Sequence, residues 1–162
     1  MPDTSVGDLT PGRADFEDAS LKSLIELHLA AMREHSPPGS VHALDASGLS
    51  APGTDLFVLS EDGQAVAMGA VRRIDATAFE IKSMRVRPDR LGRGLGRAML
   101  EHLVAEAASR GATRLSLETG SGPAFEPALK LYQSRGFRPG GAFGDYQATA
   151  FNQFFHLDLD PA

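Results

Sequence analysis

The stretch over residues 83–100 constrains the fold more than any other part of the sequence. A β-type run ends at Pro88, three glycines follow at every second position, namely Gly92, Gly94 and Gly96, and a helical pattern begins directly after them. This order places exposed backbone N–H groups at a helix N-terminus, where the helix dipole also favours anions. Glycine lets the backbone approach a ligand closely because it has no Cβ. The stretch therefore predicts a cradle for a phosphate or pyrophosphate.

The charges in this stretch leave an alternative open. Arg93 and Arg97 lie in the first helical turn, where positive charge opposes the dipole by roughly 0.3–1 kcal/mol each. An anion bound between them would reverse that effect. Without a ligand, the same stretch is a glycine-rich turn in which Arg97 and Glu101 form an exposed i,i+4 pair. The glycine spacing differs from the dinucleotide motif, and no Lys-Ser or Lys-Thr pair makes it a nucleotide P-loop.

Composition and charge limit the class of protein and the kinds of partner that the chain can have. A chain of 162 residues with 42% hydrophobic and 23% charged residues is expected to form one globular domain, with residues 1–12 as a loose lead-in. The net charge of −5 argues against a nucleic acid or an anionic membrane as partner. The absence of cysteine excludes disulfides and zinc–thiolate sites, and no metal-ligand spacing occurs. With no long apolar run and no signal pattern, we expect a soluble cytoplasmic protein.

Hydrophobic periodicity and turn residues predict the order of elements. The upstream ones are a short strand within residues 1–14, a helix over 21–32 capped by Ser20 and ended by Pro37-Pro38, and a short helix or folded loop beginning in 41–45. Three antiparallel strands follow over 55–60, 65–74 and 79–86, the first two joined by a turn at Gly63. Downstream are a helix over 94–110 ended by Gly111, a strand over 113–118, a helix from 124 or 127 to 135 ended by Gly136, and two strands within 137–159.

The strand, helix and strand around residues 94–110 form a crossover unit, so the two flanking strands should be parallel. The hairpins upstream of that unit are antiparallel. The predicted fold class is therefore α+β, or mixed α/β, with a central mixed, mostly antiparallel sheet and helices on both faces.

Three motifs resemble the GCN5-related N-acetyltransferase (GNAT) family, which binds acetyl-CoA. They are E-I-x-x-M-x-V-x-P at 80–88, R-G-L-G-R-A-x-L at 93–100, and A-x-x-L-Y-x-x-x-G-F at 128–137. With the strand order, the resemblance covers residues 14–159. Within the family, the sequence is similar to the YsnE-like acetyltransferases at 35–38, 40–45, 117–121 and 143–146. Some members of that group are linked to indole-3-acetic acid metabolism, which bears on the identity of the acceptor.

The resemblance implies that acetyl-CoA is the cosubstrate. Its pyrophosphate would be held by backbone amides of Leu91, Gly92, Arg93, Gly94, Leu95, Gly96 and Arg97. The main chain of Met84, Arg85 and Val86 would pair with the pantetheine arm as an added strand does. Leu91 stands where the family has Arg or Gln, a departure of little consequence if backbone amides do the binding.

Acetyl transfer to an amine needs a neutral nucleophile, a polarised carbonyl and a proton for the leaving thiolate. The resemblance implies that Tyr132 protonates the sulfur; otherwise it is a core residue of a helical stripe. Glu80 is the first choice for general base, directly or through water, and the alternative is an exposed salt bridge with Lys82. Glu118 is the rival base because it ends a strand at the carboxyl edge. Phe125 occupies the slot where the family often has Asn.

Histidines and late aromatic residues are candidates for the acceptor side. His28, His35 and His42 surround the first helix and the Pro-Pro turn, where the family forms its acceptor wall. Each can bind a substrate carboxylate or act as a base, or be an ordinary surface or core histidine. The aromatic candidates are Phe143, Tyr146 and Phe154. They can line an aryl-shaped pocket, or they can fill the core or a dimer interface.

The sequence thus predicts an acetyl-CoA-dependent N-acetyltransferase that acts on the amine of a small molecule, with no nucleic-acid or membrane partner. The alternative from another class is a non-catalytic acyl-CoA-binding regulatory module that docks on a partner protein. A different acyl group, transfer to oxygen, the choice of base and a homodimer all stay open.

Overall fold

The computed structural model describes residues 9, 11–42 and 44–160. Its strands form one sheet in the order β1-β2-β3-β4-β5-β7-β6. The strands are β1 Gly12–Arg13, β2 Thr54–Glu61, β3 Gln64–Arg73, β4 Ala78–Val86, β5 Arg114–Thr119, β6 Arg138–Gly140 and β7 Gln153–Asp158. The helices are α1 Ala19–His35, α2 Ala46–Leu49, α3 Leu95–Ser109 and α4 Glu126–Arg135, with short 3-10 segments η2 Pro88–Arg90 and η3 Pro123–Phe125.

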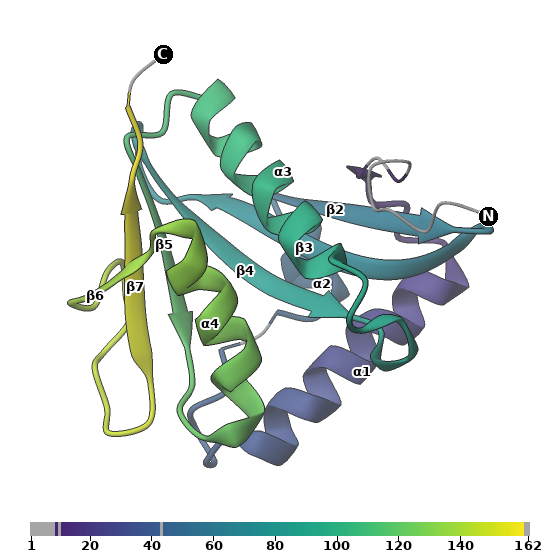
Figure 1. The fold of residues 1–162 in the computed structure, drawn as a ribbon, viewed down its shortest axis with the longest axis horizontal. Coiled ribbons are helices and arrows are strands. Elements are labelled where there is room, and N and C mark those ends of the chain that lie inside the picture. Colours follow the sequence, from purple (N-terminus) through teal and green to yellow (C-terminus); the bar gives the residue numbers. More distant parts are fainter. Residues whose placement is uncertain (1–8, 10, 43, 161–162) are drawn as a thin grey trace.

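The sheet is mixed and mostly antiparallel. Only β4 and β5 run parallel, on either side of the crossover helix α3, and the other paired strands are antiparallel. Helices α3 and α4 cover one face of the sheet, and α1 lies on the other face (Figure 1). The predicted fold class and the predicted parallel pair are confirmed.

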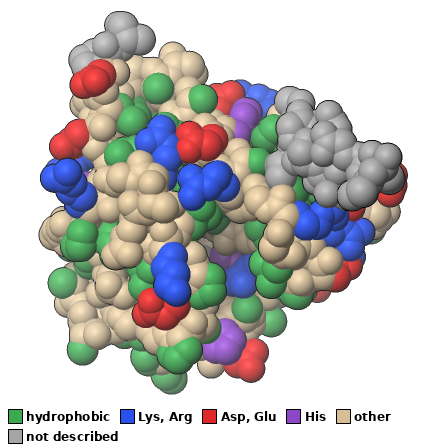
Figure 2. Space-filling view, viewed as in Figure 1, with side chains coloured by type: hydrophobic (Ala, Val, Ile, Leu, Met, Phe, Trp, Pro, Cys, Tyr) green, Lys and Arg blue, Asp and Glu red, His purple; other side chains and the backbone are tan. Residues whose placement is uncertain are grey.

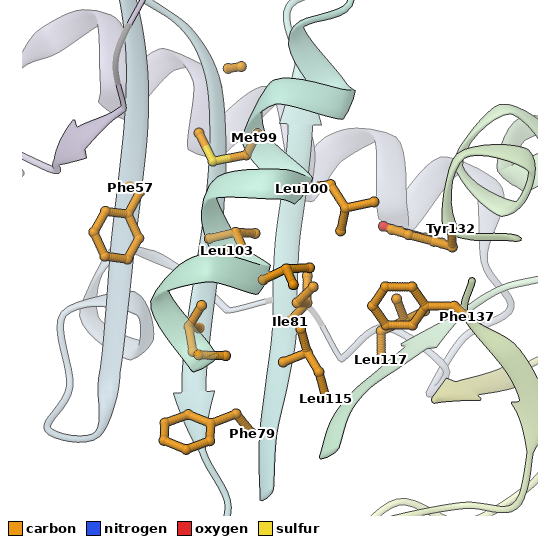
Figure 3. Packing of buried hydrophobic residues seen from close by; sticks show 14 of the residues in the cluster. Phe57, Phe79, Ile81, Met99, Leu100, Leu103, Leu115, Leu117, Tyr132 and Phe137 are labelled. Carbon is orange, nitrogen blue, oxygen red and sulfur yellow. The ribbon is translucent and has the colours of Figure 1, made fainter. Parts of the chain in front are cut away.

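Apolar side chains pack on both faces of the sheet. Under α3 and α4 they form one cluster that contains Phe79 and Leu103, which Figure 3 shows between the helix and the strands. On the other face, Leu21, Leu24 and Ile25 of α1 pack against β2 and β3. The α1 stripe follows the helical spacing seen in the sequence, so helix propensity and burial agree here.

The start of α1 differs from the prediction. Asp18 is the N-cap, and its carboxylate accepts a 2.8 Å hydrogen bond from the Ser20 backbone N–H. Ser20 lies inside the first turn, where its hydroxyl accepts a hydrogen bond from the Ala65 N–H. Asp and Ser are comparable caps, so the tertiary contact of Ser20 decides between them.

Two further expectations are refined. The second helix is the single turn α2, which Asp45 caps by accepting from the Gly48 N–H. Ala43, which the expected start included, lies outside the described residues. The short N-terminal strand is β1, which pairs with β2, whereas residues 1–8 and 10 lie outside the described residues.

The sheet opens between β4 and β5. Their pairing covers only Ala78–Glu80 against residues 114–116, after which the strands separate. Further along β4, Ser83 and Met84 together oppose Gly69 of β3, and Ser83 has a φ of 57°. This is a β-bulge, which bends its strand locally. No described helix is long and apolar enough to cross a membrane.

Candidate active site

A cavity of about 460 Å³ lies where β4 and β5 separate. Its walls come from residues 80–85 of β4, residues 117–119 of β5, and side chains of α1 and α4. Figure 2 shows this face hollowed between α4 and the start of α3, with basic and histidine side chains visible inside the hollow. The volume falls within the range of small-molecule sites.

Tyr132 of α4 lines this cavity. Its ring packs 5.9 Å from that of Phe137, and its hydroxyl points from α4 toward the β4 side (Figure 3). Helix α4 ends just beyond it at Gly136, whose φ of 107° suits glycine. Burial raises the pKa of Tyr132 to about 12, so the phenol keeps its proton at neutral pH. The side chain is thus both a core residue and a proton donor facing the cavity.

Glu80 is buried in a charged network. Its Oε2 atom accepts a 2.5 Å hydrogen bond from the Tyr146 hydroxyl and lies 3.4 Å from Lys82 Nζ. Its Oε1 atom lies 3.6 Å from Arg72 Nη1, and Lys82 also donates to the Tyr146 oxygen at 2.5 Å. The salt bridge of Glu80 with Lys82, the alternative role of this residue, therefore exists, but it is buried and not exposed, because loop 141–152 carries Tyr146 over it.

Glu118 reaches the same cavity from the end of β5. Its side chain is 10% exposed, and burial raises the pKa of its carboxyl group above the usual range. His42 Nε2 lies 3.9 Å from its Oε2 atom, and the His42 ring packs edge-on against Tyr146. Glu118 thus has weaker cationic contacts than Glu80.

His28 of α1 is buried against Arg85 of β4. Its Nδ1 atom accepts a 2.9 Å hydrogen bond from Arg85 Nε. Burial, and then the positive charges of Arg85 and Lys82, lower the pKa of His28 to about 3. The imidazole is therefore neutral at physiological pH, acting as an acceptor toward Arg85.

This lowered pKa predicts a pH dependence of stability. Between about pH 3 and pH 6.5 the unfolded chain binds a proton at His28 that the folded chain excludes, so the free energy of unfolding rises with pH and is lost as pH falls through this window. The slope from this one residue reaches about 1.4 kcal/mol per pH unit. Urea unfolding across this window should show a shallower slope for His28→Gln, and an unchanged slope would contradict the assignment.

The remaining acceptor-side candidates divide between two cavities. His35 and His42 line the first cavity with Tyr132 and both glutamates. A second cavity of about 660 Å³ shares Glu80, Lys82 and His42 with the first, and Phe143 and Tyr146 line it. Phe143 packs edge-on against Tyr146 and Phe154, with ring centroids 5.1 and 5.8 Å away. The structure therefore brings these candidates to two adjoining cavities, except Phe154, which is buried against Phe143 and lines neither.

The glycine-rich loop opens directly into α3. Gly92 and Gly94 have φ values of 81° and 78°, and a Cβ built at Gly92 would meet nothing within 4 Å. Gly94 is the N-cap, and Leu91 is 67% exposed. The loop is thus open to a ligand, and its glycines supply backbone conformations that other residues rarely adopt.

The arginines of this loop are held by protein groups. Arg90 and Arg93 each contact Glu61 of the β2–β3 hairpin at 2.7 Å, and these contacts lower the pKa of Glu61 to about 2. Arg97 donates to the Ser134 hydroxyl at 2.7 Å. The alternative pair of Arg97 with Glu101 is wrong, because Glu101 pairs with an arginine of α4. Bound to these partners, the arginines brace the loop.

The sequence over residues 21–137 matches the profile of the Acetyltransferase (GNAT) family. That match spans most of the chain. The chain belongs to the GNAT acetyltransferase family.

Several GNAT relatives align along most of their length. The uncharacterised N-acetyltransferase YsnE of Bacillus subtilis is 41% identical over 82% of this chain and 87% of its own. An IAA acetyltransferase of Azospirillum brasilense is 31% identical over 98% of this chain and 100% of its own. A crystal structure from Klebsiella pneumoniae, assigned as an acyl-CoA N-acyltransferase, is 29% identical with a TM-score of 0.78, covering 94% of this chain and 98% of that one.

As a GNAT protein, the chain is an acyltransferase of the N-acetyltransferase type. Members of the family act on amine acceptors, some of which are proteins. Within this GNAT site, reasoning from sequence missed the Glu80–Tyr146 and His28–Arg85 contacts. One signal was available, because His28 continues the buried α1 stripe that contains Leu24 and Ile25.

Proposed function

We propose that the protein transfers the acetyl group of acetyl-CoA to the amine of a small molecule by direct attack. The observation that carries this proposal is the convergence of Tyr132, Glu80 and Glu118 on one cavity beside the glycine-rich start of α3. The two adjoining cavities have the size of small-molecule sites. The Azospirillum relative, named for a small molecule, supports the same class of acceptor.

The loop before α3 fits the pyrophosphate of acetyl-CoA. The open surface at Gly92 and the helix N-terminus after Gly94 favour an anion held by the amides of residues 91–97. Beyond Glu80, β4 is no longer paired with β5. Its main chain at residues 84–86 can therefore pair with the pantetheine arm.

Acetyl-CoA supplies an acyl group activated as a thioester, so a new N–C bond replaces the C–S bond. Tyr132 donates its proton to the sulfur as the thiolate leaves, because its phenol stays protonated up to a pKa of about 12. The backbone N–H near Met84 or Arg85 polarises the carbonyl. A carboxylate of the cavity takes the proton of the attacking amine.

The contacts favour Glu118 over Glu80 as that carboxylate. Both carboxylate oxygens of Glu80 are already engaged, Oε2 by Tyr146 and Lys82 and Oε1 by Arg72, so Glu80 is committed to partners within the chain. Glu118 differs, because burial raises its proton affinity. In this proposal Glu80 holds Tyr146 and Lys82 in place, and Glu118 accepts the proton.

The isosteric pair Glu118→Gln and Glu80→Gln tests the assignment. With general-base catalysis worth about 10²–10⁴-fold, we expect Glu118→Gln to lower kcat by at least about 100-fold and to remove the acidic limb of the pH profile. In Glu80→Gln that limb should persist, even if the neighbouring network is disturbed. Steady-state rates measured across pH decide which carboxylate is the general base. If only Glu80→Gln loses the acidic limb, Glu80 is the base.

The proposed function itself is tested by screening a panel of small-molecule amines with acetyl-CoA and measuring the release of free thiol. We expect turnover with at least one class of small amine. Binding of CoA by calorimetry without turnover of any small-molecule amine would instead support a regulatory module or a protein acceptor.

A further inference from the structure

The guanidinium of Arg85 is a charged group in the cavity that has no acidic partner among the described residues. The side chain is partly buried, lines the cavity beside Tyr132, and donates through Nε to His28. Across residues 9, 11–42 and 44–160, no carboxylate lies within ion-pairing distance of it. Burial is the main cause that lowers the pKa of Arg85. Charges removed from water are normally paired, so this arrangement calls for an anion from outside the chain.

Three other arginines near the site have acidic partners. Arg90 and Arg93 share Glu61, and Arg72 faces Glu80. The two carboxylates of the cavity are also engaged elsewhere, because Glu80 contacts Tyr146 and Lys82, and Glu118 Oε2 lies 3.9 Å from His42 Nε2. Neither carboxylate is the counter-ion of Arg85.

The contact with His28 uses only Nε of Arg85 and leaves the Nη groups of the guanidinium to bind such an anion. His28 accepts only the Nε–H bond, and being neutral it adds no negative charge. The Nη groups of Arg85 keep their donors, and a planar guanidinium binds a carboxylate through two parallel hydrogen bonds. Holding Nε in place also reduces the side-chain freedom that is lost on binding.

We propose that Arg85 binds a carboxylate of the amine acceptor, so that the acceptor is an amino carboxylic acid. This inference rests on the proposed function. Arg85 faces α1 through His28, whereas its neighbours Met84 and Val86 pack with the cluster under α3. The acyl donor is expected on the α3 side, where the loop before α3 lies, so the carboxylate belongs to the acceptor. Glu118, on the same cavity, is placed to receive the amine end.

The test compares amino acids with their decarboxylated amines, measured as the ratio of the two kcat/KM values. In the wild-type protein we expect a ratio of about 10–100 in favour of the acid, since a charged bidentate pair is worth roughly 10–100-fold. Arg85→Gln should bring the ratio close to one, and Arg85→Lys should give an intermediate ratio. The matched control Arg114→Gln, at an exposed pair with Asp158, should leave the ratio and both rates unchanged.

Two further arms separate the outcomes. Calorimetry of the amino acid with the CoA-loaded protein should show binding that Arg85→Gln weakens by a similar factor, which measures the site without turnover.

A wild-type ratio near one, or a ratio unaffected in Arg85→Gln, overturns the inference and leaves the proposed function standing. A preference for succinyl-CoA over acetyl-CoA that Arg85→Gln removes would overturn it too, by assigning the carboxylate to the donor. If no amine is acetylated at all, the proposed function itself fails.

Discussion

Replacing Tyr132 by phenylalanine is expected to lower kcat by about 100-fold or more while CoA still binds. The variant keeps the ring that packs against Phe137 and removes only the proton donor facing the cavity. General-acid catalysis contributes about 10²–10⁴-fold, which sets the size of the loss. Single-turnover rates of acetyl transfer measure the effect, and thermal unfolding verifies that the fold is intact.

Because the pKa of Tyr132 is about 12, its phenol should contribute no limb to the wild-type profile between pH 6 and 9. Turnover that survives in Tyr132→Phe at the wild-type rate, with CoA affinity unchanged, would remove this residue from the mechanism. A loss of CoA affinity equal to the loss of rate would indicate a binding role instead.

Replacing Gly94 by valine is expected to weaken CoA binding by at least about 100-fold. Valine at a φ of 78° is strained by about 1–3 kcal/mol, and its branched side chain would stand where the amides should meet the pyrophosphate. Calorimetry with CoA measures the affinity directly.

Gly111, at the opposite end of α3 from the loop, provides a matched control for Gly94. Its φ is 87°, and a Cβ built there would meet nothing within 4 Å, so Gly111→Val introduces similar strain away from the loop. We expect both variants to lose comparable thermal stability and only Gly94→Val to lose CoA binding. Equal affinities in the two variants would contradict the placement of the pyrophosphate.

The elements that local chemistry dictates were predictable from the sequence. The turn at Gly63 and the helix ends at Gly111 and Gly136 occur where glycine supplies a positive φ, and the structure has each of them. The crossover around α3 follows from strand, helix and strand in succession, and the parallel pairing of β4 with β5 confirms it.

The details of the site depend on contacts between residues far apart in the chain. Tyr146 reaches Glu80 across 66 positions, and Arg85 reaches His28 across 57. No periodicity or motif encodes these pairs, because they depend on where loop 141–152 and α1 cross the sheet. The strand alternation correctly placed Glu80 beside Lys82. It did not predict that the pair is buried, because Tyr146, which covers it, comes from a distant loop.

The bulge in β4 reverses which side of the sheet its side chains face. Before it, the even-numbered Glu80 and Lys82 face away from the α3 cluster, where Lys82 acts on His28 of α1, and Ile81 packs under α3. Beyond it, the even-numbered Met84 packs under α3 and the odd-numbered Arg85 faces α1. A strand of unbroken alternation would direct Arg85 into the apolar core and Met84 to the α1 side. One inserted residue thus lets a single strand present Glu80, Lys82 and Arg85 on the same side, although their spacing in the sequence changes midway.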